Sequence, residues 1–145
     1  MSAPEIVLAR HGQTEWSRTM RHTGRTDVPL TEEGRDEARL LAAQLAERDF
    51  GVVLVSPLSR AVETCRLAGL GDRGEAREEL LELDYGDYEG LTTAEIRETV
   101  PGWTVWTHGS PGGETLADVG ARLAPLVEEL RSCLLYTSPS PRDRS

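Results

Sequence analysis

The stretch Ile6-Val7-Leu8-Ala9-Arg10-His11-Gly12 decides the fold. Its first four residues form a short apolar run, which is typical of a strand buried within a parallel sheet. The run leads directly into Arg10 and His11, so a cation and an imidazole are expected at the carboxyl end of this strand. Ligands of open α/β sheets bind beyond the carboxyl ends of the strands. The stretch therefore predicts a parallel sheet with a ligand site at its edge.

The rest of the chain alternates between predicted strands and helices. A second apolar run covers residues 52–55 and is broken by Ser56-Pro57, after which a helix is expected over residues 59–68. Thr31 and Thr92 precede apolar periodic segments and predict helix caps, and Thr115 does the same for a last helix to about residue 130. Residues 69–75 read as a loop. This alternation predicts an α/β domain with a mainly parallel sheet.

Length, charge and cysteine content narrow the class of protein. The 145 residues suit one domain, and a net charge of −9 argues against a nucleic-acid surface, which needs a basic patch. The sequence lacks an apolar run long enough for a membrane helix, and residues 1–5 lack the pattern of a signal peptide. Cys65 and Cys133 show neither metal-ligand spacing nor a disulfide framework. We expect a cytoplasmic protein with a small-molecule partner, without nucleic acid or membrane.

A second cation lies at the same predicted sheet edge. Arg60 falls in the first turn of the helix that follows the second strand. A cation at a helix N-terminus is unfavourable because that end of the dipole is already positive, and a bound anion would resolve the conflict. A solvent-directed Arg60 is the simpler alternative. Two strand ends that offer Arg10, His11 and Arg60 together favour a phosphate site.

The segment from Glu82 to Gly90 holds four acids among Gly and Tyr residues. Phosphoryl transfer from an ester oxygen needs a general acid to protonate the leaving alkoxide. A carboxyl group beside the negative charge of a phosphate stays protonated more readily and suits that role. The alternative is a solvated acidic loop, an interpretation that suits Asp87 and Glu89 well.

Five ordered motifs together resemble the histidine phosphatase superfamily, which is phosphoglycerate mutase-like. They are LARHGQTEWS (8–17), HTGRTDVPLT (22–31), SPLSRAVET (56–64), LELDYGDYEGLT (81–92) and PGGET (111–115). The resemblance covers residues 5 to 131. The Asp-Tyr-Gly-Asp-Tyr-Glu-Gly run and the segment with Trp103 and Trp106 look most similar to the sedoheptulose-bisphosphatase-like branch of sugar phosphatases.

The resemblance implies a three-layer sandwich and a role for each matching residue. His11 would attack phosphorus and become a phosphohistidine, Arg10 and Arg60 would clamp the phosphoryl oxygens, and Glu82 would donate the proton. The resemblance implies neither a metal nor a cofactor. Positions that would line the substrate site are Gly12, where room for a phosphate is expected, and Thr14, Ser17, Thr23, Gly24 and Tyr85. The expected activity is hydrolysis of a small phosphorylated metabolite, such as a sugar phosphate.

Two other functions stay open. A phosphoglycerate-type mutase would return the phosphoryl group to its substrate. It is disfavoured by the short path from Glu82 to Pro101, which leaves little room for a lid, and by the absence of Lys. A non-catalytic phosphate-binding module is the alternative from another class. For the remaining candidates, we expect His22 and His108 to be surface residues, Trp16 to pack its loop, and Glu114 to tie loops or cap a helix. Arg25 is either a contact to an anionic substrate group or an exposed side chain.

The end of the chain departs from the family pattern. The family carries a second His at the end of a later strand, and that strand is missing here, so the domain over residues 1–131 is expected to be partial. Residues 132–145 include CLLYTSPSPRD, which resembles the translation of a sequencing adapter, and we expect a disordered, non-native tail. The chain is then expected to fold poorly and to be nearly inactive.

Overall fold

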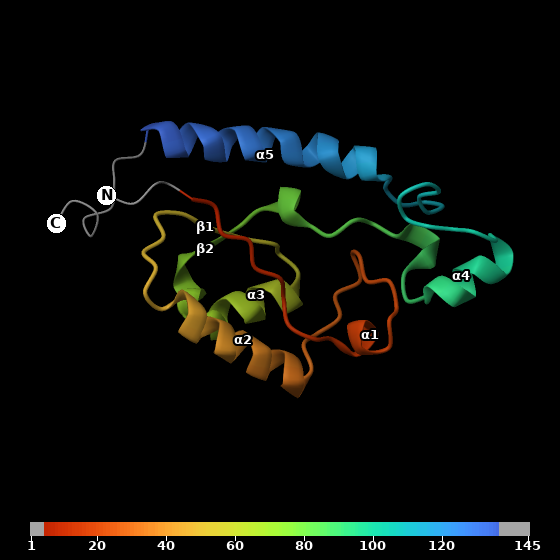
Figure 1. The fold of residues 1–145 in the computed structure, drawn as a ribbon, viewed down its shortest axis with the longest axis horizontal. Helices are drawn as coiled ribbons and strands as arrows, with labels where there is room; N and C mark the ends of the chain where they lie inside the picture. Colours follow the sequence, from red (N-terminus) through yellow and green to blue (C-terminus); the bar gives the residue numbers. More distant parts are fainter. Residues whose placement is uncertain (1–4, 137–145) are drawn as a thin grey trace.

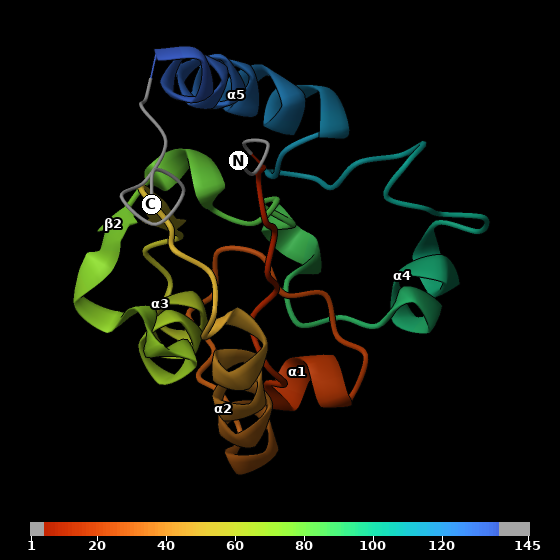
Figure 2. The ribbon, with the colours of Figure 1, turned by 60° about the vertical axis from the view of Figure 1, so that its left-hand side comes forward.

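The computed structural model describes residues 5–136, and the side chains of residues 5–132. Two groups of helices lie on opposite sides of a middle layer of strands and extended chain, with α5 on one side and α2 and α3 on the other (Figures 1 and 2). This arrangement agrees with the expected α/β sandwich. The main elements are α1 (Glu15–Arg18), α2 (Glu32–Leu45), β1 (Val53–Val55), α3 (Ser59–Cys65), β2 (Gly74–Ala76), α4 (Thr93–Thr99) and α5 (Leu116–Tyr136).

Threonine caps begin the helices at the predicted places. The Thr31 hydroxyl accepts from the Gly34 amide at 3.0 Å to start α2, and the Thr92 hydroxyl accepts from the Glu95 amide at 3.2 Å to start α4. Thr115 accepts from the Asp118 amide at the start of α5. Each hydroxyl satisfies an amide that has no partner within its helix, which is why the helices begin there.

The sheet contains one strand that the sequence does not predict. Within the described residues, β1 pairs in parallel with β2, in the register Val53↔Gly74, Leu54↔Glu75 and Val55↔Ala76. The loop prediction for residues 69–75 is therefore wrong in its last part. Gly74-Glu75-Ala76 has no apolar pattern, so only its pairing with β1 makes it a strand.

The predicted strand at Ile6–Ala9 is present as extended chain that joins no sheet among the described residues. Its apolar side chains are consequently uncovered, with Leu8 91% and Ile6 50% exposed. An isolated strand is not stable without a neighbour that accepts and donates its backbone hydrogen bonds. The prediction fails because it presumed such a neighbour.

A cavity of about 350 Å³ lies against this segment, and we call it the slot. Most of its lining is apolar and comes from the N-terminal segment, from β1, from α2 and from the chain around α3. The apolar lining includes Val7, Leu41, Leu45, Val53, Val55 and Ala68, and polar lining residues include Arg10, His11, Ser56 and Glu82.

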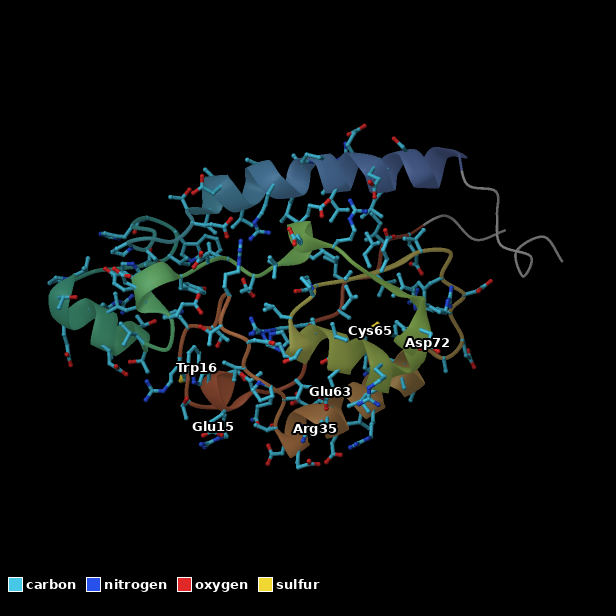
Figure 3. All side chains as sticks on the ribbon, turned by 180° about the vertical axis from the view of Figure 1, so that it is seen from behind. Glu15, Trp16, Arg35, Glu63, Cys65 and Asp72 are labelled. Carbon is cyan, nitrogen blue, oxygen red and sulfur yellow. The ribbon has the colours of Figure 1, made fainter. Side chains whose placement is uncertain are left out.

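Helices α2 and α3 are joined by an ion pair that Figure 3 labels. Arg35 Nε lies 2.5 Å from Glu63 Oε1, and Arg35 also contacts Glu32 at 2.6 Å within α2. On the far side of the molecule, the indole of Trp103 is 2% exposed and donates to the Gly109 carbonyl at 2.8 Å. These contacts hold α2 against α3 and anchor the chain that follows α4.

The last helix, α5, continues to Tyr136, so the start of the stretch expected to be a tail is helical. Residues 137–145, on which most of that expectation falls, lie outside the described residues. Of the helices in the described part of the chain, none combines the length and apolar character needed to span a membrane.

Candidate active site

His11 follows the extended segment and lines the slot. Its Nδ1 lies 2.7 Å from the Gly12 carbonyl oxygen, which only accepts hydrogen bonds, so Nδ1 carries the proton. The lone pair of the neutral ring is then on Nε2. Burial lowers the pKa of His11 below its ordinary value, and the nearby charges of Arg60 and Arg10 lower it further. The ring is therefore held in its neutral form.

Gly12 is required by a close contact between two backbones. A Cβ at Gly12 would lie 2.2 Å from the Gly34 carbonyl oxygen, and a Cβ at Gly34 would lie 2.1 Å from that of Gln13. The Gly12 amide also donates to the Thr64 hydroxyl at 3.2 Å. Gly12 therefore has no room for a side chain on the face that packs against α2, although it lines a cavity together with Arg10 and His11.

Arg60 is almost fully buried at the start of α3, with 1% of its surface exposed. Its guanidinium donates to the Gly24 carbonyl at 2.6 Å and to the Thr26 carbonyl at 2.7 Å. The carboxylate of Asp27 accepts from the Ser59 amide at 2.8 Å, which satisfies an unpaired amide of the same helix end. The conflict between Arg60 and the helix dipole is thus relieved in part by carbonyl oxygens, and the surface alternative is wrong.

The four side chains expected to do the chemistry converge on one place. The charges of Arg60, Arg10 and Glu82 all act on His11, and Arg10, His11 and Glu82 line the slot together. Glu82 also acts electrostatically on Arg60. A carboxyl group, an imidazole and a guanidinium group around one hollow, with the charge of Arg60 acting on the imidazole, can bind an anion and exchange a proton with it.

The backbone of Glu82 is anchored from two sides. Arg25 Nε donates to the Glu82 carbonyl at 3.1 Å, and Arg122 Nη2 donates to the same carbonyl at 3.3 Å. Both arginines also bind the Glu114 carboxylate, and hydrogen bonding from Arg122 lowers the pKa of Glu114 to about 2. Glu114 therefore ties loops together, which is one of the two roles expected for it. We call Glu114, Arg25 and Arg122 the Glu114 clamp, so Arg25 has a structural contact here.

Two of the expected substrate contacts are structural. Thr14 has no exposed surface, and its hydroxyl accepts from the Ser17 amide at 3.0 Å. The Ser17 hydroxyl accepts from the Thr14 amide at 2.9 Å in return. This reciprocal pair is the capping box of α1, so the prediction that Thr14 contacts a substrate is corrected. Ser17 is half-buried in the same cap.

The other three expected contacts differ in their placement. The Thr23 hydroxyl donates to the Arg21 carbonyl at 3.1 Å, and no described contact links it to His11. Gly24 is buried and supplies the carbonyl oxygen for Arg60. Tyr85 is half-buried, and burial raises its pKa, as do the charges of Glu82 and Glu89. Tyr85 thus stays near the expected site.

Three residues were misjudged or missed. His22 is half-buried, with its ring 4.9 Å from that of Tyr85 and 5.2 Å from that of Trp103, so the surface assignment is wrong. His108 is exposed, as expected. Thr64 and Glu89 organise the site although neither was a candidate. Their partners lie 52 and 65 residues away in sequence, which no local pattern reveals.

A model of the histidine phosphatase superfamily (branch 1) matches residues 6–134. The chain belongs to this superfamily. An acid phosphatase of Mycobacterium tuberculosis is 49% identical over 119 residues, which are 81% of this chain and 58% of that protein. The sedoheptulose 1,7-bisphosphatase of Saccharomyces cerevisiae is 31% identical, with 89% of this chain and 56% of that protein covered. The histidine phosphatase relatives also include mutases, such as a 2,3-bisphosphoglycerate-dependent phosphoglycerate mutase of Mesorhizobium japonicum at 40% identity, covering 83% of this chain and 65% of that protein.

Solved histidine phosphatase structures share the fold. A mycobacterial glucosyl-3-phosphoglycerate phosphatase in complex with VO3 superposes with a TM-score of 0.77 at 36% identity, covering 84% of this chain and 64% of that one. The chain thus spans about three fifths of the length of the relatives it matches. The α/β class and the family resemblance are both confirmed by these comparisons.

Proposed function

We propose that the domain to which this chain corresponds is a phosphomonoesterase that hydrolyses a small phosphorylated metabolite, such as a sugar phosphate, through a phosphohistidine. The observation that carries the proposal is the neutral His11 ring, whose Nδ1 is committed to Gly12 and which lies within the fields of Arg10 and Arg60. Relatives named as phosphatases support the direction of the reaction.

The proposed reaction has two steps. His11 Nε2 attacks phosphorus, the bond from phosphorus to the ester oxygen breaks, and Glu82 gives its proton to the leaving oxygen. A water molecule then attacks the phosphohistidine while Glu82 takes its proton, and the bond from phosphorus to nitrogen breaks to release inorganic phosphate. Arg10 and Arg60 stabilise the charge on the phosphoryl oxygens in both steps.

The same proposal holds that this chain itself turns over slowly. The slot beside His11 is lined mostly by apolar side chains, which offer few groups to orient a polar substrate. The test is alkaline intact-mass spectrometry after incubation with p-nitrophenyl phosphate. We expect a phosphoryl adduct on wild type and on the exposed control His108→Ala, and none on His11→Ala. An adduct that survives in His11→Ala would disprove the assignment of the nucleophile.

Mutase activity is a second candidate, because mutases are among the relatives. The absence of Lys from the sequence counts against it, since a carboxylate substrate is commonly held by such a cation. Isotopically labelled phosphohistidine offered 3-phosphoglycerate and water in competition separates the two. Label in free phosphate indicates the hydrolase, and label in bisphosphoglycerate indicates the mutase.

A further inference from the structure

The carboxylate of Glu89 is an acceptor for three consecutive backbone amides. The Gly24, Arg25 and Thr26 amides each donate to it at 3.1 Å. The Thr26 hydroxyl donates at 2.7 Å and the Tyr85 amide at 2.9 Å. The Glu89 carboxylate is therefore surrounded by hydrogen-bond donors of the protein. It is not the solvated loop residue that its sequence context suggests.

This arrangement depends on a charged group with two acceptor oxygens. Burial raises the pKa of Glu89, but the donors from Thr26, Tyr85 and Gly24 bring it below its ordinary value, so the group is ionised at neutral pH. The approach is also close, because a Cβ on Gly24 would lie 2.1 Å from Glu89 Oε2. The same Cβ would lie 2.2 Å from the Leu83 carbonyl oxygen, so the packing of this segment requires a glycine at position 24.

The opposite edge of the same short segment faces Arg60. The amides of Gly24 and Thr26 point to Glu89, whereas their carbonyl oxygens accept from the two terminal nitrogens of Arg60. The segment is thus held between an anion on one edge and a cation on the other. If the carboxylate is removed, the segment loses its anchor and Arg60 loses the fixed pair of acceptors that orients its guanidinium.

We propose that Glu89 is a positioning residue, which sets the orientation of Arg60 through the backbone of residues 24–26. The inference rests on the proposed function, in which Arg60 holds a phosphoryl group. The guanidinium has five N–H bonds in a fixed plane, so anchoring two of its nitrogens determines where the remaining donors point. A misoriented plane would still carry its charge but would lose two-point contact with an anion.

The test compares Glu89→Gln with Asp87→Asn, an exposed residue of the same loop with the same loss of charge. Inorganic phosphate is the probe, with its dissociation constant measured by calorimetry and the Arg60 guanidinium signals followed by NMR. Because the amide group of Gln replaces one acceptor with a donor, we expect about tenfold weaker phosphate binding and shifted Arg60 signals in Glu89→Gln. Asp87→Asn should match wild type in both.

Each further outcome decides the question. Glu89→Gln with wild-type phosphate affinity and unchanged Arg60 signals would overturn the proposal, even if its stability falls. If wild type binds no phosphate, the proposed function fails, and the Arg60 signals alone then judge Glu89. If Glu89→Gln does not fold, Thr26→Val removes one hydroxyl bond to the carboxylate. Smaller Arg60 shifts in that variant would support the proposal, and none would refute it.

Discussion

Individual neighbouring residues shift the pKa of His11. Burial holds the pKa of His11 below its ordinary value of 6.5, Arg10 lowers it and Glu82 raises it. We expect Arg10→Gln to raise the pKa of His11, and Glu82→Gln to lower it, each by about 0.3 pH units at moderate salt. NMR titration of the His11 ring measures both. Shifts of the same sign in the two variants would contradict the placement of these charges around His11.

The sign of the pH dependence follows from the same lowering. In the proposed reaction the reactive form is the neutral ring, so formation of the phosphohistidine should rise with pH through the lowered pKa of His11 and then level off. Folding is affected as well. Because the folded pKa lies below the unfolded one, the unfolded state binds the proton more readily, and stability falls as the pH drops through 6.5. When the phosphorylation rate is measured against pH, its plateau should therefore begin at a lower pH than for a histidine with the ordinary pKa.

Much of the site could be predicted at the residue scale. Strand ends, charge and family motif predict His11, Arg10, Arg60 and Glu82; the structure places Arg10, His11 and Glu82 along one cavity, and the charge of Arg60 acts on His11. Thr14 was not assigned correctly, because a threonine three residues before a serine caps a helix as readily as it binds a phosphate. The role of Glu89 could not be predicted, because the sequence does not show whether water or backbone amides donate hydrogen bonds to an acidic side chain in a loop.

Among the elements, α2 packs closely against the backbone of residues 12–13 through Gly12 and Gly34. Gly34→Ala would place a methyl group within 2.1 Å of the Gln13 carbonyl oxygen, so we expect a loss of about 2 kcal/mol in the free energy of unfolding. Gly120→Ala is the matched control, since nothing lies within 4 Å of its Cβ and it is inside α5. It should gain about 0.5–1 kcal/mol from helix propensity. Urea denaturation compares the two, and equal effects would refute the close contact.

The Glu114 clamp joins α5 to the loop that carries Glu82. Its folded pKa of about 2 lies below the ordinary value of 4.5, so its stabilisation is full above 4.5 and is lost as the pH falls toward 2. We expect Glu114→Gln to cost about 2 kcal/mol at neutral pH and to flatten the acid limb of stability. Glu98→Gln, an exposed change on α4, should alter stability by less than about 0.5 kcal/mol. If Glu114→Gln keeps the wild-type acid slope, the clamp does not anchor α5.

The elements show why prediction stops where partners matter. Caps at Thr31, Thr92 and Thr115 were found because a cap is a local contact of about three residues. Strand β2 was missed and the strand at Ile6–Ala9 was overstated for one reason, because a strand exists only where another strand pairs with it. The sequence of a segment specifies its capacity to pair, whereas the rest of the molecule supplies the neighbour.

For the molecule as a whole, we expect exposed apolar side chains beside the slot to promote self-association. Leu8 is 91% exposed on extended chain, between Val7 and Ala9, which line the largely apolar slot. We expect wild type to bind an apolar dye and to associate with itself as concentration rises, and Leu8→Gln to reduce both. Light scattering and dye fluorescence measure the effects. Leu40→Gln, on the exposed side of α2, is the control, and equal relief by both variants would show that association is not specific to the slot.

Arg60 carries a consequence for the speed of recognition. Its buried side chain already donates hydrogen bonds to the carbonyl oxygens of Gly24 and Thr26 before any ligand arrives. The entropy of freezing a long, rotamer-rich arm is therefore spent during folding and not during the encounter. An arriving anion meets a receptor that needs no rearrangement, so its capture should be limited by diffusion and ionic strength, not by the protein's own motion.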